Sequence, residues 1–526
     1  MFKNIFKKLF FVFLFVLMSK ISISQSVNVP LNHWAYNFLE RLETRGTFRS
    51  LLLRARPISR NDLTKILVQI EKTSEQKNVG FSKSELDLFE QLKGEFHEEL
   101  GELSINTNNR LHERHLLKWE ENNNKFKIDL DFRQRFEINR GDQFDSTKRI
   151  SNTTVGGIIQ GKLKNSLAFY IHFKNTLVKG ENIEHENYNP DQGMPIVIAG
   201  ENAFKDDASA YFVWKLPWFE LEFGRDQAQW GPGYQGSLML SRFNPLFDML
   251  KIRAEFNRFY FTSIHGELKS SHGTKYFTAH RIEFQPLPWL YLAGSESVIY
   301  GNRDVEAQYL NPIMPYHIAE HHLGDKDNNT MAFELTMFPF RGHKFYGELF
   351  LDDFTSSENP FSYFGNKFAF LTGHFWVNPL GISNTGFRTE YTRIEPYVYT
   401  HHKPINVYQH YNQNIGHWLK PNSDQLYFEI NSQINRDLNV KFLAERIRHG
   451  EGDINTPHKK EDGMKKSFLS GVVETRWRFG IDITDQIIRD FFLTLQYNFL
   501  DTKNLDQIPG KNSRDNQVIF QLSVNW

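Results

Sequence analysis

The chain contains no cysteine, which excludes disulfide bonds, thiolate metal ligands and a cysteine-linked lipid anchor. It has no excess of either charge, because Lys+Arg and Asp+Glu both total 62, and this balance gives no reason to expect a nucleic-acid partner. The G-x-S-x-G, Walker and dinucleotide-binding glycine patterns are also missing. We therefore expect a non-catalytic protein with no cofactor and no metal site; the alternative is a hydrolase that assembles a Ser, a His and an acidic residue from separate strands.

Beyond its first residues, the chain has no run that is long and apolar enough for a transmembrane helix. The start, "MFKNIFKKLFFVFLFVLMSKISISQS", has a lysine-rich segment and then an apolar segment from Leu9 to Met18. Ser22 and Ser24 supply the small residues of a cleavage site. This pattern predicts a signal peptide over residues 1–24 and a mature chain that begins at Gln25; the alternative is an uncleaved anchor.

Aromatic residues are abundant, at 15% of the chain, and 48 of them are Phe. The mean hydropathy is nevertheless −0.52, a value typical of soluble proteins. In a transmembrane β-barrel only alternate residues meet lipid, so the average stays polar. Export, a high aromatic content and a polar average together indicate an outer-membrane β-barrel.

Residues 25–118 have helical periodicity. In "HWAYNFLERLETRG" the apolar residues share one face, Asn32 is expected to cap the helix, and Gly46 is expected to end it. "SRND" (59–62) and "SKSE" (82–85) resemble capping boxes at the starts of two further helices. The pattern predicts a small helical module, which we expect to lie in the periplasm.

From about Lys125 the period changes to two. In "FKIDLDF", Phe126, Ile128 and Leu130 alternate with charged residues, and "LAFYIHF", "FELEF", "LYFEINSQI", "LNVKFLAE" and "FFLTLQYNF" repeat the pattern. A soluble sandwich also alternates, but normally on short strands with one face in water. The long series of strands with an apolar face favours a barrel.

The final segment, "NQVIFQLSVNW", places apolar residues on one face and ends on Trp526. It resembles the signal that outer-membrane barrels present to the barrel-assembly machinery. At ~10 residues a strand plus connections, the remaining length gives about 18 strands. We predict an all-β transmembrane antiparallel barrel over residues 119–526, preceded by the α-helical module.

Five segments together resemble the Wzi capsule-assembly family. They are "HWAYNFLERLETRG…RPISR" near the start, "GRDQAQWGPGYQGSLMLSRFNP" (224–245), "YLNPIMPY" (309–316), "GELFLDDF" (347–354) and "GHWLKPNSD" (416–424). The resemblance implies an outer-membrane barrel with a periplasmic helical module. It also implies a lectin function, because the type member of the family holds capsular polysaccharide on the cell surface.

The front module is also similar to a single S-layer-homology motif, in which Trp34 and Arg60 are the matching positions. That resemblance implies contact with the cell wall. The S-layer-homology family usually carries several copies, and helix packing alone explains Trp34.

The stretch "QWGPGYQGSL" (229–238) interrupts a strand-like run, and its glycines and proline are expected to end regular pairing. The side chains that it and the preceding run offer to a sugar are Arg225, Gln227, Gln229, Trp230, Tyr234 and Gln235. Aromatic faces pack on sugar rings, and the polar groups bond hydroxyls or acidic sugars. The alternative is a structural plug that narrows the barrel and binds nothing.

A second candidate is the aromatic and polar segment 397–425, which we expect to be an outer loop. Its candidate polysaccharide-binding residues are Tyr397, Tyr399, His402, Tyr408, His410, Tyr411 and Trp418. The alternative is a loop whose aromatic residues pack on one another.

Two further motifs have little support as sites. His317 and His321 have the spacing of helical metal ligands, but the neighbouring prolines favour a loop. Asp352 and Asp353 are adjacent in a strand, so they point to opposite faces and cannot form a glycosidase pair.

The sequence thus predicts an outer-membrane protein that binds capsular or other surface polysaccharide and supports capsule assembly. Its other expected partners are membrane lipid, the assembly machinery and, through the helical module, the cell wall. The alternatives are a porin-like channel and an accessory factor for surface motility or secretion.

We expect deletion of the last three residues, "VNW", to cause degradation of the protein in the periplasm. The last strand must pair to close the barrel, and an open edge cannot be accommodated in lipid. The measurement is the amount of protein in the outer-membrane fraction, with heat-modifiable gel migration as the marker of a folded barrel. A normal surface level of the deleted protein would contradict the barrel interpretation.

Overall fold

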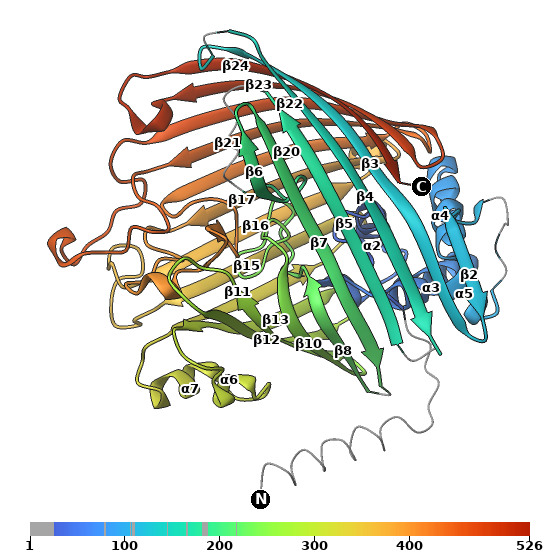
Figure 1. The fold of residues 1–526 in the computed structure, drawn as a ribbon, viewed down its shortest axis with the longest axis horizontal. Coiled ribbons are helices and arrows are strands. Elements are labelled where there is room, and N and C mark those ends of the chain that lie inside the picture. Colours follow the sequence, from blue (N-terminus) through green and yellow to red (C-terminus); the bar gives the residue numbers. More distant parts are fainter. Residues whose placement is uncertain are drawn as a thin grey trace, which may run out of the picture.

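A computed structural model of the chain describes residues 26–77, 80–105, 107, 111–144, 146–164, 167–180, 188–216 and 218–525. Over these residues 18 antiparallel strands form a closed barrel (Figure 1), as predicted. The strands of the first half of the ring are β3 (Asn124–Gly141), β4 (Lys148–Leu163), β5 (Leu167–Lys179), β7 (Asn202–Lys215), β8 (Phe219–Asp226), β10 (Phe247–Phe256), β11 (Phe259–Leu268), β12 (Lys275–Leu287) and β13 (Leu290–Gly301). Those of the second half are β14 (Asn328–Met337), β15 (His343–Asp353), β16 (Lys367–Val377), β17 (Thr385–Ile394), β20 (Ser423–Gln433), β21 (Leu438–His449), β22 (Glu474–Ile488), β23 (Phe491–Lys503) and β24 (Ser513–Asn525).

The barrel closes where β24 pairs with β3, from Asp515 opposite Gly141 to Asn525 opposite Asp131. Trp526, the expected assembly signal, lies outside the described residues, as does the predicted signal peptide. The short strands β2 (Leu117–Glu121) and β6 (Met194–Ala199) extend β3 and β7, and β18 (Gln409–His410) pairs with β19 (Gln413–Asn414).

Side chains alternate between the two faces of the wall as the period of two predicts. Apolar residues point outward and are exposed, for example Phe173 at 50%, Phe212 at 52% and Phe442 at 53%. Charged residues such as Glu222 and Glu429 point inward and are buried. None of the described helices is both long and apolar enough to cross a membrane. The exposed apolar side chains form a belt that is suited to lipid.

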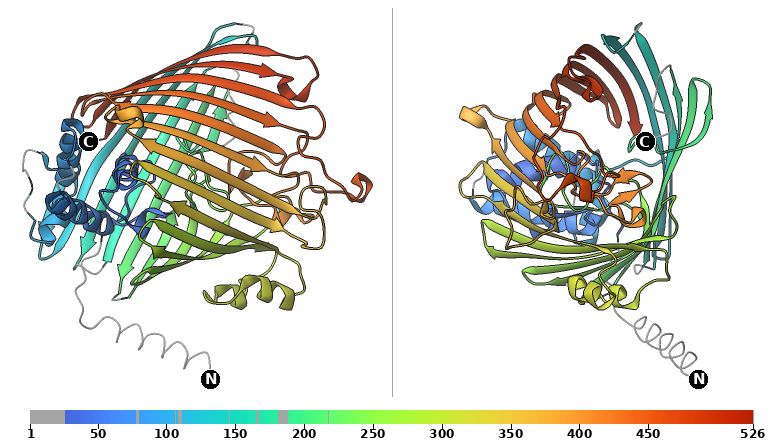
Figure 2. Two further views of the ribbon diagram at one scale, coloured as in Figure 1. Left: turned by 180° about the vertical axis from the view of Figure 1, so that it is seen from behind. Right: turned by 90° about the vertical axis from the view of Figure 1, so that its left-hand side faces the viewer.

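The two ends of the barrel differ in their connections. At one end the turns are short, such as 257–258 between β10 and β11 and 489–490 between β22 and β23. At the other end the connections are long, and they include 227–246, 302–327 and 395–422. Figure 2 shows the N-terminal helices at the short-turn end.

The helices of the N-terminal module are α2 (Ala35–Arg45), α3 (Arg60–Lys77), α4 (Lys83–Glu95) and α5 (His97–Glu102). Gly46 ends α2 with a φ of 86°, and Ser82 with Glu85 forms the predicted capping box of α4. Ser59 accepts a hydrogen bond from the Asp62 amide at 3.1 Å, as in a capping box. The expected cap at Asn32 is wrong, because Trp34 holds that position and no side chain caps the helix.

The helical module shares its core with the barrel. Leu39, Leu42 and Leu63 of the helices belong to one buried cluster with Tyr260 and Tyr291 of the wall. Arg60 is buried against Glu99, and Trp34 packs against Phe38, so both residues that match the S-layer-homology motif are engaged within the protein.

Buried ion pairs fix the module to the inner wall. Glu40 of α2 accepts hydrogen bonds from Lys344 at 2.6 Å and from Arg388 at 2.8 Å, and both cations point inward from barrel strands. Burial by itself raises the pKa of Glu40, but the charges of Arg388 and Lys344 outweigh it and hold the pKa well below its ordinary value of 4.5.

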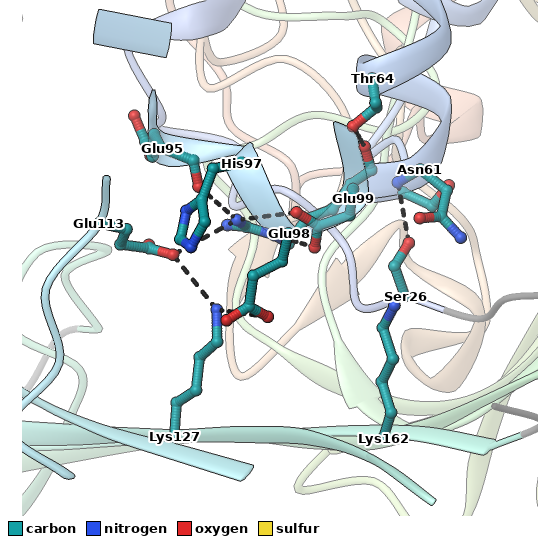
Figure 3. Close-up of polar contacts among 12 residues, drawn as sticks. Ser26, Asn61, Thr64, Glu95, His97, Glu98, Glu99, Glu113, Lys127 and Lys162 are labelled. Carbon is teal, nitrogen blue, oxygen red and sulfur yellow. Dashed lines mark hydrogen bonds and ion pairs between the residues drawn. The ribbon is translucent and has the colours of Figure 1, made fainter. Parts of the chain in front are cut away.

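A second group of ion pairs joins α5 and the segment that follows it to strands β3 and β4; Figure 3 shows the pairs of Lys127. Lys127 of β3 lies 3.2 Å from Glu98 and 3.4 Å from Glu113, and Lys162 of β4 donates to Glu102 at 2.5 Å. Burial raises the pKa of Glu98, but Lys127 and Lys118 reverse this effect and lower the pKa to about 2. The module is therefore held at two separate places on the wall.

We expect Glu40→Ala to destabilise the docked module by about 3–5 kcal/mol, because two buried cations lose their counter-ion. In the native chain, carboxyls with lowered pKa values contribute stability above pH 4.5, and this contribution is lost as the pH falls toward 2. Urea unfolding in detergent micelles, followed by far-ultraviolet circular dichroism, measures both effects. Lys511→Ala, which breaks an exposed ion pair with Asp506, is the control; equal losses in the two variants would contradict the argument.

Candidate functional site

The stretch after β8 leaves the wall and enters the lumen. Trp230 is 1% exposed and belongs to a buried cluster with Phe277, Ile299 and Phe350, which point inward from three strands. The Trp230 amide donates to the Leu240 carbonyl at 2.9 Å, so the segment folds back on itself. The interruption of the strand therefore serves to fill the lumen with residues 227–246.

Two positions in this segment require glycine. Gly231 has a φ of +126°, and a Cβ there would lie 2.7 Å from Glu348 Oε2. A Cβ at Gly233 would lie 1.8 Å from the Gly236 carbonyl oxygen. The turn is thus too tight for any side chain at either position.

Inward carboxylates satisfy the backbone of the inserted segment. Glu348 of β15 accepts hydrogen bonds from the amides of Leu238 at 2.9 Å and Met239 at 3.2 Å. Glu390 of β17 accepts from the amides of Tyr234 at 2.7 Å and Gln235 at 2.8 Å. Because these amides have no strand partner, the carboxylates replace the ladder bonds that the segment gave up.

The expectation that 397–425 is an outer loop is wrong for most of its length, because residues 395–422 fold into the lumen (Figure 2). The hydroxyls of Tyr399 and Tyr408 donate to the carbonyls of Leu238 at 2.6 Å and Met239 at 2.9 Å. The Ser241 amide donates to the Ile415 carbonyl at 3.0 Å. The two candidate segments therefore pack on each other as one plug.

His410 is held as a neutral imidazole inside this plug. Its Nε2 lies 3.0 Å from the Leu246 carbonyl and its Nδ1 lies 2.9 Å from the Lys269 amide, so Nε2 donates and Nδ1 accepts. Burial lowers the pKa of His410 to about 4. Its role in the structure is to join the plug to the end of β11.

The predicted polysaccharide-binding residues fall into two groups. Gln229, Trp230, Tyr399, Tyr408 and His410 are buried in the plug, and Arg225, Tyr234, Gln235, Tyr397, His402, Tyr411 and Trp418 keep some exposure. The structure brings together Tyr234, Gln235 and Trp418, since Trp418 Nε1 donates to the Gln235 carbonyl at 2.8 Å. Arg388 lies 4.1 Å from the ring centroid of Tyr234 and covers one face of it. The role of these residues as glycan ligands stays a prediction.

The plug also contacts the helical module. Strand β1 (Ala55–Arg56) pairs with β9 (Gln229–Trp230), with Ala55 opposite Trp230 and Arg56 opposite Gln229. Segments that enter the lumen from opposite ends of the barrel thus meet at Trp230.

On the other side of the lumen, a polar cavity of about 380 Å³ lies against β3, β4, β7 and β24. Its charged residues are Arg133, Arg135, Glu137, Asp191 and Lys205, and its neutral polar residues are Asn152, Thr154, Tyr188, Asn189, Gln192 and Gln521. None of these residues is among the predicted polysaccharide-binding residues, which were chosen for their aromatic and loop-like surroundings. Their signal in the sequence is "FRQRFE", where arginines alternate with outward phenylalanines and must point inward.

The two arginines of the cavity remain accessible to water. Arg135 pairs with Glu137 at 2.9 Å, whereas the nearest approach of Arg133 to Asp191 is a longer 3.5 Å. Their side chains are 26% and 24% exposed. Guanidinium groups with free N–H bonds bind hydroxyls and, as bidentate donors, carboxylates. The arrangement is suited to a polar or acidic ligand.

The remaining motifs carry no site in the described part of the chain. His317 and His321 lie on helix α7 (Tyr316–His322), so the expected loop is wrong; Pro315 precedes the first turn, where a missing N–H is tolerated. No group of three or more His, Cys, Asp or Glu suitable for a metal occurs among the described residues. Asp352 is buried and accepts from the Tyr399 amide at 2.5 Å, whereas the Asp353 side chain is 60% exposed, so the two point apart as predicted.

We expect Gly233→Ala to disturb the plug and raise ion conductance in planar bilayers, because the added methyl group would collide with the Gly236 carbonyl. Gly294→Ala is the matched control, since a Cβ at that strand glycine meets nothing within 4 Å. If the native protein already conducts freely and Gly233→Ala leaves the conductance unchanged, the segment does not seal the lumen.

The sequence matches the family of the capsule assembly protein Wzi over residues 132–517. No curated protein sequence gives a significant match. Among solved structures, the chain is similar to Wzi of Escherichia coli, described as an outer-membrane protein involved in group 1 capsule assembly and as a carbohydrate-binding β-barrel. The identity is 15% and the TM-score is 0.60, over 94% of this chain and 99% of that chain.

OccK8 (OprE) and OccK5 (OpdH) of Pseudomonas aeruginosa are less similar, with TM-scores of 0.45 and 0.42. Each is 10% identical over 76% of this chain and 98% of its own. The similarity to the Escherichia coli structure shows the fold, and the family match covers most of the barrel. The chain therefore belongs to the Wzi family of capsule assembly proteins and is an outer-membrane β-barrel.

Proposed function

We propose that this protein binds surface polysaccharide inside the barrel, at the Arg133–Arg135 cavity, and thereby supports capsule assembly without catalysis. The observation that carries the proposal is the polar cavity lined by strands β3, β4, β7 and β24 and by the connection that includes residues 188–192. Its volume of about 380 Å³ is within the range of about 300–1,000 Å³ typical of ligand pockets. The description of the similar Escherichia coli protein as carbohydrate-binding supports the same ligand class.

The wall beside the cavity extends the same chemistry. Inward polar groups continue across β20 to β24, where Glu445 pairs with Arg478 at 3.0 Å and Lys441 with Asp482 at 2.6 Å. Arg478 is 32% exposed and Lys441 is 25% exposed. A chain of sugar hydroxyls would find donors and acceptors along this surface.

A binding role is favoured over a channel. The plug occupies the lumen beside β10 to β17 with fully buried rings such as Tyr399 and Tyr408, and the helical module closes the short-turn end. Dry packing of this kind leaves no path for water on that side of the lumen.

The non-catalytic role is supported by the contacts of the cavity carboxylate Glu137. A glycosidase uses a pair of carboxyl groups that flank the scissile bond. Glu137 is instead engaged within the wall, by Arg135 at 2.9 Å, Gln517 at 2.8 Å and Asn139 at 2.9 Å.

We also propose that the helical module lies in the periplasm and that the domain boundaries fall near residues 24 and 118. Short turns face the periplasm in outer-membrane barrels, and the helices lie at the short-turn end. The long connections would then face outward, where polysaccharide is met. The cell wall is a weaker proposal as a partner, since Arg60 is already engaged with Glu99.

We expect the double substitution Arg133→Ala and Arg135→Ala to weaken retention on immobilised capsular polysaccharide at least tenfold. Each hydrogen bond to a charged group contributes about 1.5–3 kcal/mol, and about 1.4 kcal/mol is a factor of ten. Affinity chromatography at increasing salt measures the effect.

Arg514→Ala is the matched control, because that arginine is 75% exposed and lies outside the cavity. Single-channel conductance of the same samples tests the rival function. If the double variant is retained as well as the native protein, the polysaccharide site lies elsewhere. If the native protein forms open pores and is not retained, it functions as a channel.

A further inference from the structure

The connection between β13 and β14 contains two short helices, α6 (Ala307–Leu310) and α7, which lie outside the ring of strands (Figures 1 and 2). We call residues 305–323 the outer hairpin. Unlike the two inserted segments, which fill the lumen, it covers the outer face of the wall at the long-loop end of β12 and β13.

Polar residues of the wall hold the outer hairpin in place. Glu296 of β13 points outward and accepts hydrogen bonds from the amides of Tyr316 at 2.8 Å and His317 at 2.6 Å. Thr278 of β12 donates to the Tyr309 carbonyl at 3.0 Å, and the Tyr316 ring lies 4.3 Å from the His280 ring. These contacts cover outward polar groups that would otherwise face lipid or solvent.

From this contact toward the short-turn end, the outer face of the wall becomes apolar. His280 of β12 is opposite Glu296 of β13. Two residues nearer the short-turn end, Ile282 of β12 is opposite Gly294 of β13, and Gly294 is also opposite Phe333 of β14. Ile282 is 49% exposed and Phe333 is 50% exposed. Two residues along a strand span about 7 Å, so only about this distance separates the hairpin contact from the first lipid-facing side chains. The hairpin therefore lies at the long-loop edge of the lipid-facing belt.

The hairpin itself presents apolar side chains on its free side. Tyr309 and Tyr316 are buried against the wall, whereas Leu310 is 49%, Ile313 79% and Ile318 48% exposed. Three such side chains at the margin of the belt extend a surface that lipid already covers. Short elements with one apolar side bind at the boundary between headgroups and acyl chains.

We propose that the outer hairpin is a lipid-binding element, and that Leu310, Ile313 and Ile318 enter the acyl-chain boundary of the leaflet on the long-loop side. Its partner is the lipid bilayer and not a second protein. The proposal rests on the barrel fold and does not depend on polysaccharide binding.

The absence of cysteine allows a direct test, since a single introduced thiol can carry a nitroxide label. The variants are Ile313→Cys in the hairpin, Phe333→Cys in the belt as the lipid reference and Met464→Cys, 63% exposed on another long connection, as the water reference. Each full-length variant is reconstituted into phosphatidylcholine vesicles. Spin-label relaxation then measures access to oxygen, which concentrates in lipid, and to a water-soluble nickel chelate.

The measured quantity is the ratio of oxygen accessibility to chelate accessibility, which rises with depth in the bilayer. We expect this ratio to be at least threefold higher for the Ile313 label than for the Met464 label, and lower than for the Phe333 label. An Ile313 label that matches the Met464 label would overturn the proposal. So would dipolar broadening between Ile313 labels, because it would show that a second copy of the chain covers the hairpin. If labelling at Ile313 prevents folding, Ile318→Cys repeats the measurement with the same two references.

Discussion

The packing of the lumen depends on the carboxylates of Glu348 and Glu390, which accept hydrogen bonds from backbone amides of the segment that follows β8. A chain that leaves a strand inside a barrel loses its ladder partners, and its amides must find other acceptors. Glu348 and Glu390 supply them at 2.7 to 3.2 Å from inward positions on β15 and β17. With residues 227–246 fixed in this way, Tyr399 and Tyr408 can bond their carbonyls, and β9 can pair with β1 of the helical module. Plug, module and wall therefore form one connected interior.

This interior divides the lumen into two environments. Beside β10 to β17 the space is dry, because Trp230, Tyr399 and Tyr408 are at most 1% exposed among inward apolar side chains. Beside β20 to β24, β3 and β4 the wall carries paired charges that remain partly exposed, and a cavity of about 380 Å³ lies there. The dry side gives the plug its rigidity, and the wet side offers polar groups to a ligand. Rigid placement of those groups favours selective binding.

Much of the fold could be read from the sequence. Alternation in segments such as 126–132 gives strands whose faces are fixed, since a shift of one residue would turn Phe126 inward and Lys127 toward lipid. Gly46 and the Ser82–Glu85 pair mark helix ends because caps act within a few residues. The number of strands follows from length, because the membrane sets how long each strand must be.

The destination of the long connections could not be read from the sequence. Segment 397–425 has the polar and aromatic composition of an exposed loop, yet the structure buries Tyr399, Tyr408 and His410 in the lumen. Composition does not distinguish the two outcomes, because the deciding partners, Leu238, Met239 and Leu246, are 161 to 169 residues away along the chain. The Arg133–Arg135 cavity could not be predicted for the same reason, because its lining residues come from four strands and one connection that are distant along the chain. The sequence by itself determined which side chains face lipid and which face the lumen, because that depends on local alternation. Only the tertiary structure decided which inward side chains are buried by the plug and which remain open to a ligand, because that depends on contacts between distant segments.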